Sequence, residues 1–184
     1  MTSANKRGPW QITEQSVRYE NPWIRVDHHE VIAPTGKPGI YGTVHFKGTA
    51  VAILPLADNG DTWLVGQYRF PLQVYSWELP MGGCPRDEAP LDAAKRELRE
   101  ETGLLAEHYQ SLGFFHVSNC ITDEEARAFL ATGLSEGETE FDDTEELEIR
   151  RLPFEEALAM TLDGRITDLV SVAAIQRARL LGLA

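Results

Sequence analysis

The chain has little of what would assign it to a disulfide-rich, membrane-spanning or secreted class. It has two cysteines, Cys84 and Cys120, which are too few for a disulfide framework and do not have zinc-site spacing. The longest apolar run, residues 50–56, is far too short to cross a bilayer. Residues 1–10 lack the apolar core of a signal peptide. We therefore expect a cytoplasmic protein with no membrane partner.

Positive charge is also scarce. The 184 residues include 17 Lys and Arg against 29 Asp and Glu, which gives a formal net charge of −12. A protein that binds nucleic acid without sequence preference needs a basic surface, so this class is disfavoured. An anionic small-molecule substrate would need bound cations and a few local arginines to reverse the local field.

What the chain does have is an ordinary globular composition, 42% hydrophobic and 25% charged. Its length suffices for one well-cored domain with a modest extension. His28 and His29 are adjacent, but no HExxH motif follows them, so we interpret both as strand residues. The sequence shows no internal repeat and no low-complexity linker.

Strand patterns dominate the first third of the chain. Residues 23–32 and 40–46 are rich in β-branched and aromatic residues and flank a turn, and a further short strand is predicted between Trp10 and Tyr19. A few strands alone are marginally stable, so this segment should pack on the main domain or on a second subunit. Residues 50–57 and 62–69 flank an Asn-Gly turn, which predicts a hairpin.

The rest of the chain alternates helices and strands. A helix is predicted over residues 88–102, with Leu91, Ala94 and Leu98 on the face opposite its glutamates and Gly103 as C-cap. The later predicted elements, in order, are a strand at 109–117, an irregular loop from 118, an acidic tract at 136–148, a strand at 147–153, a helix at 154–162 and a last helix from about 168. This order predicts an α/β fold, a mixed β-sheet with helices on both sides.

Residues 82–104, GGCPRDEAPLDAAKRELREETGL, carry the strongest signal in the chain. Helical spacings of three and four place Glu97, Glu100 and Glu101 on one face beside Arg96. Like charges placed this way oppose the helix by ~0.2–0.5 kcal/mol per pair, so a use for the charge is expected. Mg²⁺ takes oxygen ligands and can bridge carboxylates to phosphate. A solvated helix face is the alternative, but the fixed spacing of glycine, arginine and glutamates favours a metal site.

This segment resembles a complete Nudix box. The matching positions are Gly82, Glu88, Arg96, Glu97, Leu98, Glu100, Glu101, Gly103 and Leu104. The resemblance covers most of residues 45–180, strongly in the box and loosely elsewhere. It implies an α/β/α sandwich and hydrolysis of a nucleoside diphosphate linked to another moiety, with Mg²⁺ or Mn²⁺. We expect residues 1–47 to be an N-terminal antiparallel β-strand extension for dimerisation and substrate recognition, and residues 48–184 to be the Nudix hydrolase domain.

The resemblance also implies roles for the box residues. Glu97 and Glu101 would be the principal metal ligands, with Glu100 as a further ligand or catalytic helper. The backbone carbonyl of Met81 would complete the ligand set, because the glycines that follow it let the backbone approach closely. Arg96 would hold the glutamates in place, and Glu88 would fix the junction between the box loop and the helix.

The general base is expected outside the box, on a late loop, as in many relatives. The tract FDDTEELEI offers Asp142, Asp143, Glu145 and Glu146. By its offset from the following strand, Glu145 best matches a distal metal-binding and catalytic glutamate, with Asp143 or Glu146 then acting as base. The alternative for each is a solvated acidic loop.

Segments outside the box resemble the ADP-ribose pyrophosphatase and nucleotide-sugar branch. In GQYRFP and WELPMGG, Arg69 would approach phosphate and Glu78 would contact substrate. Arginine suits this role because its fork pairs bidentately with phosphate oxygens, although a surface ion pair is the alternative. One departure is residues 118–124, SNCITDE, where relatives often carry a proline and a glycine; this leaves other nucleoside diphosphate sugars open.

Members of this branch are commonly dimers that exchange N-terminal segments, so a homodimer is expected. Trp23, with Trp10 and Tyr19, is a candidate for stacking on the base of the substrate, but for each ring taken separately a core position is expected.

Two rival functions use the same box. A nucleoside triphosphate pyrophosphatase would release pyrophosphate or phosphate instead of a sugar phosphate. A non-catalytic nucleotide sensor with this fold would regulate a partner, but such modules often have a degraded box, and this box is intact. The expected function is therefore hydrolysis of ADP-ribose or a related nucleoside diphosphate sugar into a nucleoside monophosphate and a sugar phosphate.

Overall fold

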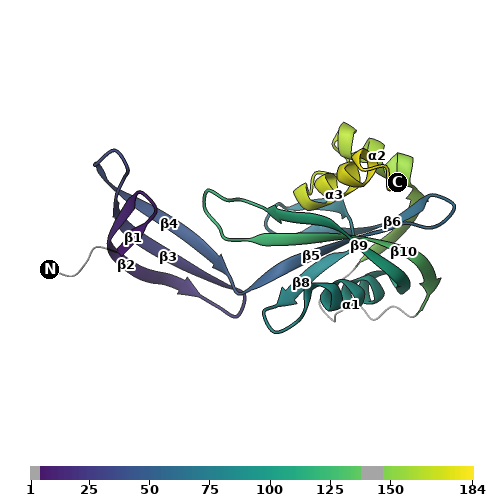
Figure 1. The fold of residues 1–184 in the computed structure, drawn as a ribbon, viewed down its shortest axis with the longest axis horizontal. Helices are drawn as coiled ribbons and strands as arrows, with labels where there is room; N and C mark the ends of the chain where they lie inside the picture. The colour runs from purple at the N-terminus through teal and green to yellow at the C-terminus, as the bar shows by residue number, and fades with distance from the viewer. Residues whose placement is uncertain (1–4, 138–146) are drawn as a thin grey trace. The chain divides into compact units, whose positions relative to one another are not determined.

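The computed structural model describes residues 5–137 and 147–184, and its strands fall into three sheets (Figure 1). The chain divides into two units. The first consists of Met1–Gly48 together with Ser118–Glu124, and the second of Thr49–Val117 with Glu125–Ala184. Segment 118–124 therefore belongs with the N-terminal strands, an association that the sequence pattern did not indicate.

The first unit is a four-stranded antiparallel sheet in the order β1-β2-β3-β4. The strand bounds are Asn5–Arg7 for β1, Trp10–Glu20 for β2, Ile24–Ile32 for β3 and Pro38–Phe46 for β4. The prediction of extended structure was right, although β2 is longer than expected. Segment 118–124 lies alongside β4: the Val44 N–H donates to the Ile121 carbonyl at 2.9 Å, and Val44 forms an isolated β-bridge with Thr122.

The second unit contains a mixed sheet and a smaller antiparallel sheet. The mixed sheet has the order β8-β5-β10-β9, with β10 parallel to β5 and antiparallel to β9. Its strands are β5 (Gly48–Pro55), β8 (Met81–Pro85), β9 (Leu104–His116) and β10 (Glu125–Glu136). The antiparallel sheet has the order β11-β6-β7, with β6 at Asp61–Arg69, β7 at Val74–Glu78 and β11 at Glu148–Pro153.

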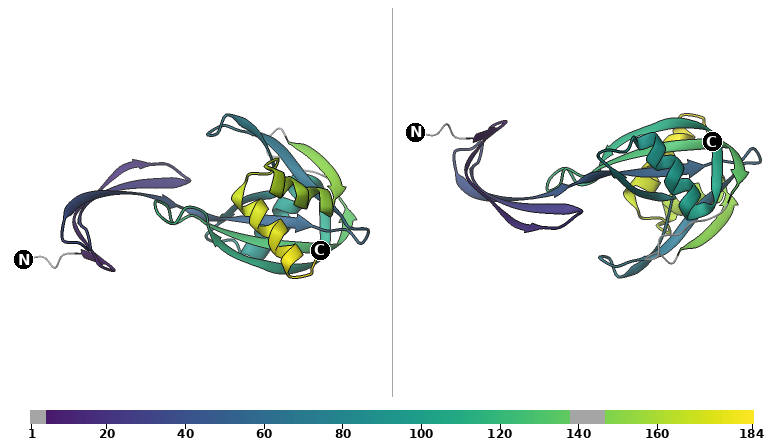
Figure 2. Two further views of the ribbon diagram at one scale, coloured as in Figure 1. Left: turned by 90° about the horizontal axis from the view of Figure 1, so that it is seen from above. Right: turned by 90° about the horizontal axis from the view of Figure 1, so that it is seen from below.

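Helices cover both faces of these sheets, as the α/β/α prediction requires. Strand β5 shows why: Val51 and Ile53 pack in one cluster with α1 (Pro90–Thr102), whereas Ala52 and Leu54 pack in another with α3 (Leu169–Leu180). Alternate side chains of a strand point to opposite faces, so a strand apolar at every position needs cover on both. Helix α2 (Phe154–Asp163) lies beside α3, on the face away from α1 (Figure 2).

Two local predictions were wrong. Strands β5 and β6 do not form a hairpin: apart from one bridge between Leu56 and Thr62, they pair in different sheets. The turn itself forms, with Gly60 at a φ of 84°, but β5 instead takes β8 and β10 as neighbours. Strand β10 was not predicted at all, although it lies centrally between β5 and β9. No helix in the described part of the chain has both the length and the hydropathy needed to cross a bilayer.

Candidate active site

Helix α1 carries the box glutamates, and its ends follow from its sequence. Pro90 at the first turn starts it, and Gly103, with a φ of 70°, ends it by donating its N–H to the Arg99 carbonyl at 2.8 Å. The predicted apolar face was partly wrong, because Leu91 is exposed and Ala93 is buried in its place. Ala94 and Leu98 are buried, as predicted.

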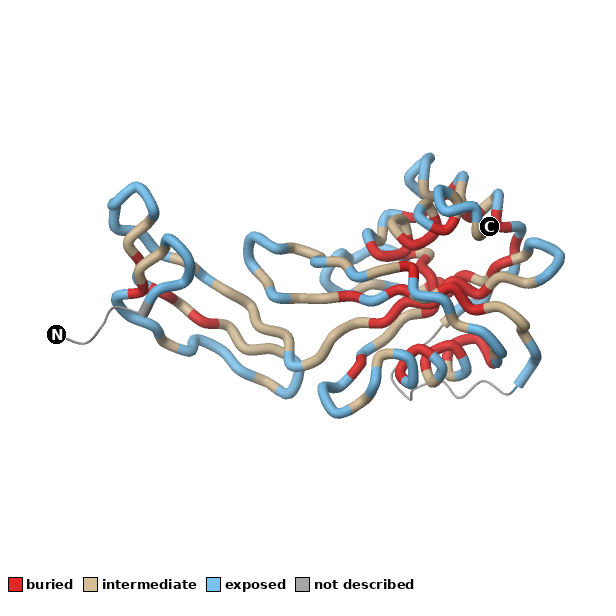
Figure 3. Tube along the Cα trace, in the orientation of Figure 1, coloured by how far each residue is buried: buried red, intermediate tan, exposed pale blue. Residues whose placement is uncertain are grey.

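Two of the three glutamates on the face opposite these apolar residues are buried as well. Glu97 is 9% exposed and Glu101 only 2%, whereas Glu100 is intermediate. Strand β8 explains the burial, because α1 packs on it and the Met81 N–H and the Gly83 carbonyl are partners of helix side chains. Figure 3 shows buried residues, in red, along the helix. A carboxylate that is removed from water needs compensating partners. The contacts of Glu97 and Glu101 supply them.

Gly82, in β8, permits the closest approach in the site. A Cβ atom built on Gly82 would lie 2.2–2.3 Å from the carboxylate atoms of Glu97, which is far inside van der Waals contact. At Gly83 the same construction meets nothing within 4 Å. The first glycine of the box is therefore required by contact with Glu97, because only a residue without a side chain leaves room for that carboxylate.

Arg96 is the cation that holds the carboxylates together. Its Nη1 donates to Glu97 at 2.6 Å and to Glu100 at 3.0 Å, and its Nε and Nη2 pair with Glu88 at 3.1 and 2.9 Å. The Nη2 atom also donates to the Gly83 carbonyl at 2.8 Å. The bond with Glu88 is the largest cause of the raised pKa of Arg96 and also lowers the pKa of Glu88. The arginine thus joins the box loop, Glu88 and the helix, as the sequence predicted.

Glu101 is tied to the strand in a second way. The backbone N–H of Met81 donates to Glu101 Oε2 at 2.8 Å. The two buried glutamates therefore both contact the start of β8, Glu101 at Met81 and Glu97 at Gly82. The peptide between Met81 and Gly82 therefore lies beside the carboxylates of Glu97 and Glu101, and the metal-binding role predicted for these groups stays a prediction.

The donors around α1 suit a hard divalent cation, because they are oxygens from carboxylates and a backbone carbonyl. They are not drawn together as tightly as a bound ion would require. In residues 5–137 and 147–184, the one group of three potential ligands with atoms all within 4.8 Å of one another is Asp27, His29 and His45, in the first unit. The box carboxylates are instead bridged by Arg96, and a metal would supply the charge that brings them closer.

Arg69 and Glu78, both predicted to contact substrate, contact each other. The Nε atom of Arg69 donates to the two Glu78 oxygens at 2.9 and 3.2 Å, and its Nη2 also bonds Oε2. Glu78 is buried at 3% exposure, so this is not the surface ion pair that was the alternative for Arg69. The bond to Glu78 is the main cause of the raised pKa of Arg69, and the nearby carboxylates of Asp168 and Glu101 contribute.

Strand β7 ends at Glu78. The next residue, Leu79, is held by a contact that the sequence did not predict. The N–H of Leu79 donates to Ser171 Oγ in α3 at 2.9 Å, and both residues are fully buried. Ser171 also donates its own N–H to the side chain of Asp168, which caps α3. A serine inside an amphipathic helix is usually read as a neutral position, so only the structure shows that it anchors the Glu78 segment.

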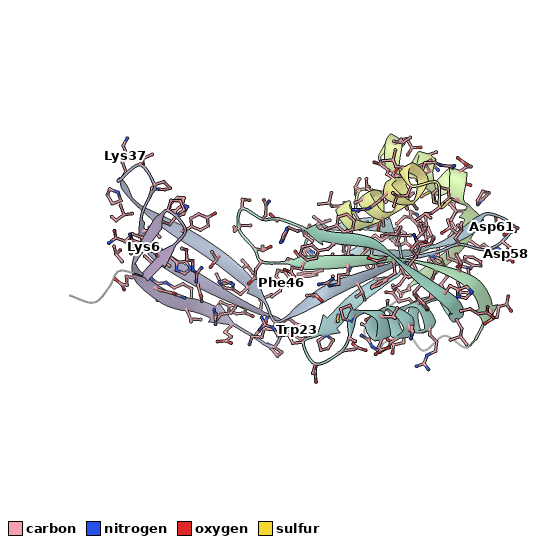
Figure 4. The ribbon with its side chains drawn as sticks, in the orientation of Figure 1. Lys6, Trp23, Lys37, Phe46, Asp58 and Asp61 are labelled. Atoms are coloured by element: carbon pink, nitrogen blue, oxygen red, sulfur yellow. The ribbon has the colours of Figure 1, made fainter. Side chains whose placement is uncertain are left out.

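The aromatic candidates belong to the first unit and differ from one another. Trp23 is 72% exposed in the turn between β2 and β3 (Figure 4). Asn21 Oδ1 fixes this turn by accepting the N–H groups of Trp23 and Ile24. Tyr19 is exposed as well, so a core position is wrong for both rings. Trp10 packs edge-on against Tyr41 instead.

The predicted base loop lies outside the described residues. Glu145 and Glu146, together with Asp142 and Asp143, all fall in the range 138–146. Their predicted roles stay predictions.

Comparisons with known proteins agree with this site. A family model described as the NUDIX domain matches residues 46–171, and one described as the nucleoside diphosphate sugar hydrolase N-terminal domain matches residues 10–44. An ADP-ribose pyrophosphatase of Bacillus subtilis is 35% identical over 149 residues, 80% of each chain. A methanol dehydrogenase activator of Bacillus methanolicus is 32% identical over 155 residues, 83% of each. A crystal structure titled ADP compounds hydrolase aligns over 98% of this chain and 99% of its own, with a TM-score of 0.83 and 21% identity.

Proposed function

We propose that this chain, which belongs to the Nudix family, is a Mg²⁺-dependent pyrophosphatase that cleaves ADP-ribose or another nucleoside diphosphate sugar. The products would be a nucleoside monophosphate and a sugar phosphate. One observation carries the proposal: Glu97 and Glu101 are buried against strand β8, where Arg96 donates a hydrogen bond to Glu97 and the Met81 N–H donates one to Glu101. The N-terminal family match and the similarity to the B. subtilis pyrophosphatase support the class of substrate.

The metal would be held by Glu97, Glu100, Glu101 and the carbonyl of Met81, with Glu145 as a distal ligand. The donor set fits Mg²⁺, and Mn²⁺ would fit it as well, because all the donors are oxygens. When bound, such ions activate water and neutralise charge on the phosphates. The protein's part is to align these carboxylates, and the contacts of Arg96 with Glu97 and Glu100 and the close approach of Glu97 to Gly82 support this role.

We propose the remaining roles as follows. Arg69 would bind a phosphate through its fork, and Glu78, buried beneath it, would orient that fork. Trp23 would stack on the base, since it is exposed and unlike Trp10 has no aromatic neighbour among the ring contacts of the described residues. With Glu145 as the distal metal-binding and catalytic glutamate, Asp143 or Glu146 would act as general base, and Glu100 would assist.

Product analysis tests the proposal most directly. ADP-ribose, several nucleoside diphosphate sugars and nucleoside triphosphates are incubated with enzyme and Mg²⁺, and products are identified by chromatography. A nucleoside monophosphate with a sugar phosphate is expected, and EDTA should abolish their formation. Pyrophosphate or phosphate from triphosphates alone would favour the rival triphosphate pyrophosphatase. Binding of nucleotides without turnover would favour the sensor, and turnover in excess EDTA would contradict metal dependence.

Two further properties are proposed with this function. A homodimer is supported by the large side chains that the first unit exposes, among them Val17, Tyr19, Trp23 and Ile40. Light scattering after size-exclusion chromatography tests it, and a monomer at all concentrations would contradict it.

A cytoplasmic location is supported by two cysteines that are both free, one of them exposed. Fractionation of cells that express the protein tests this location.

A further inference from the structure

The first unit has almost no apolar core. Among its described residues, the buried hydrophobic side chains are Ile12 and Val31, and the buried polar ones are Asp27 and His29. A unit of this size cannot bury enough apolar surface to be stable by itself, and small units commonly use a partner, a disulfide or a metal ion instead. Two of these four buried residues, Asp27 and His29, therefore have side chains that can bind a metal ion.

The strand register places these polar residues together. In the antiparallel pair of β3 and β4, Asp27 lies opposite Thr43, and Arg25 lies opposite His45. Alternate residues of a strand share a face, so Asp27 and His29 of β3 lie on the same face as Thr43 and His45 of β4. Four polar side chains from two neighbouring strands therefore meet on one side of a thin sheet.

The polar atoms of Asp27, His29, Thr43 and His45 lie close enough together to form one cluster. One potential ligand atom from each of Asp27, His29 and His45 lies within 4.8 Å of the other two. His45 Nε2 is 3.6 Å from Asp27 Oδ2. The hydroxyl of Thr43 lies between the two imidazoles, 3.0 Å from His29 Nε2 and 2.9 Å from His45 Nε2.

An independent observation is that the buried polar atoms of this cluster are not satisfied. His29 Nδ1 is buried and has no hydrogen-bond partner, and Asp27 Oδ1 is buried with no hydrogen bond, although Arg25 Nε lies 3.1 Å from it. Leaving such groups unpaired costs about 1–3 kcal/mol each. A pocket of about 240 Å³, whose lining includes His29 and Thr43, opens beside His29 and would give a ligand access.

Asp123 completes the arrangement from outside. Its carboxylate accepts a hydrogen bond from His45 Nδ1 at 2.6 Å and another from the Phe46 N–H at 2.9 Å. In the tautomer that donates from Nδ1 to Asp123, His45 Nε2 accepts from the Thr43 hydroxyl at 2.9 Å, and Asp27 Oδ2 lies 3.6 Å from it. A carboxylate on the outer nitrogen of a histidine is the usual second partner in zinc sites.

We propose that Asp27, His29 and His45 bind one Zn²⁺ ion, which joins β3 to β4 and stabilises the first unit. Two imidazole nitrogens and one carboxylate oxygen are ligands that Zn²⁺ accepts, with a water from the pocket as the fourth. Mg²⁺ prefers oxygen alone and would not compete well here. The site is separate in sequence and in chemistry from the box carboxylates, and it does not depend on the proposed hydrolysis.

Charge around the cluster sets one condition for binding. Burial, together with Arg7, lowers the pKa of His29. Arg25 pairs with Asp27 and is the cation that Zn²⁺ must replace, and Gln15 Nε2 also donates to Asp27 at 2.9 Å. The Arg25 side chain is 41% exposed, so it can turn into solvent when the ion binds.

Metal content in the presence of excess Mg²⁺ tests the proposal. The protein is stripped with a chelating resin, dialysed against dilute Zn²⁺ with Mg²⁺ in large excess, and analysed by mass spectrometry of its metals. One equivalent of zinc per chain is expected for wild type, and none for Asp27→Asn or His29→Asn. His28→Asn is the matched control, because it changes the adjacent histidine of the opposite strand face and should keep the zinc. Equal zinc in the His28 and His29 variants would overturn the proposal.

Two variants at more exposed positions keep the test decisive if a buried variant does not fold. Arg25→Gln removes the competing cation and should tighten zinc binding in calorimetry by several-fold. Asp123→Asn removes the outer partner of His45 and should weaken it by about 10–100-fold. Circular dichroism checks that both are folded. A weaker affinity for Arg25→Gln, or an unchanged one for Asp123→Asn, would show that the cluster is only a hydrogen-bond network.

Discussion

Two polar clusters in this molecule are built from different ligands and are held in different ways. Helix α1 presents three carboxylates from one turn and a half of chain, and Arg96 bridges two of them. The first unit assembles one carboxylate and two imidazoles from neighbouring strands, with Thr43 between the rings. The second cluster has all its ligand atoms within 4.8 Å of one another, and the first does not.

Electrostatics explains the difference. Two carboxylates 4 Å apart repel by about 1 kcal/mol in water and about 4 kcal/mol near a protein surface, so three cannot close up without a cation among them. Neutral imidazoles carry no such cost, and a histidine–aspartate cluster can be assembled in advance. The box should therefore tighten when metal arrives and depend on it strongly, whereas the sheet cluster should change little in geometry.

The largest expected effect is that of Glu101→Gln on turnover. The glutamine keeps the shape and can still accept the Met81 N–H, but it removes the charge that a metal would bind. We expect the turnover number at saturating Mg²⁺ to fall at least about 100-fold, since even outer partners of metal ligands cost 10–100-fold.

Glu107→Gln, an exposed glutamate on β9, is the control and should keep full activity. Wild-type turnover from Glu101→Gln would break the comparison, because the box cluster would then have no need of its charge.

A smaller effect is expected from closing the space beside Glu97. In Gly82→Ala the new methyl group would overlap the Glu97 carboxylate, so that side chain must move away from the site. We expect about a 10-fold loss of activity, because small displacements of catalytic groups are costly, and destabilisation by about 1–3 kcal/mol. Steady-state kinetics and denaturant unfolding measure the two effects.

Gly83→Ala is the matched control, since an added Cβ meets nothing within 4 Å there. Equal loss in both variants would mean that the glycines serve the backbone and not the close approach to Glu97.

The comparison also shows what a sequence can reveal. The box was predictable because its residues are close together in the chain and because helical spacing alone places Glu97, Glu100 and Glu101 together. The layered fold could be predicted from the order of the helices and strands and from the family resemblance. The end of α1 at Gly103 needed only the local preference of glycine for positive φ.

What could not be predicted depends on strand pairing over long distances. His28 and His29 were correctly interpreted as strand residues, but nothing local places His29 opposite Tyr41 or joins His45 to Asp123, 78 residues away. The false hairpin has the same origin: an Asn-Gly turn is a local signal, while the partners of β5 are chosen by burial on both faces. The burial of Glu97 and Glu101 likewise depends on β8 crossing the helix.

Arg69→Lys tests whether Arg69, unlike Arg96 of the box and Arg25 of the sheet cluster, binds substrate. Lysine keeps the charge but cannot pair with two oxygens of Glu78 or of a phosphate at once. We expect KM for the nucleotide sugar to rise about 10-fold, as a lost charge-assisted hydrogen bond of about 1.5 kcal/mol would give, with a smaller change in kcat. Arg18→Lys, on exposed β2, is the control. An unchanged KM would assign Arg69 to holding Glu78 alone.

The smallest effect concerns the pH dependence of the Arg96 clamp. The hydrogen bonds from Arg96 lower the pKa of Glu88 below its ordinary value of 4.5, so the folded state holds this carboxylate charged more readily than the unfolded chain does. That stabilisation is fully present above pH 4.5 and is lost as the pH falls through the lowered pKa. Glu88→Gln should therefore lower the melting temperature by a few degrees at neutral pH and progressively less in acid, whereas the exposed control Glu14→Gln should have no such trend. A deficit for Glu88→Gln that stays constant with pH would show that Arg96 holds the box loop by hydrogen-bond geometry rather than by charge.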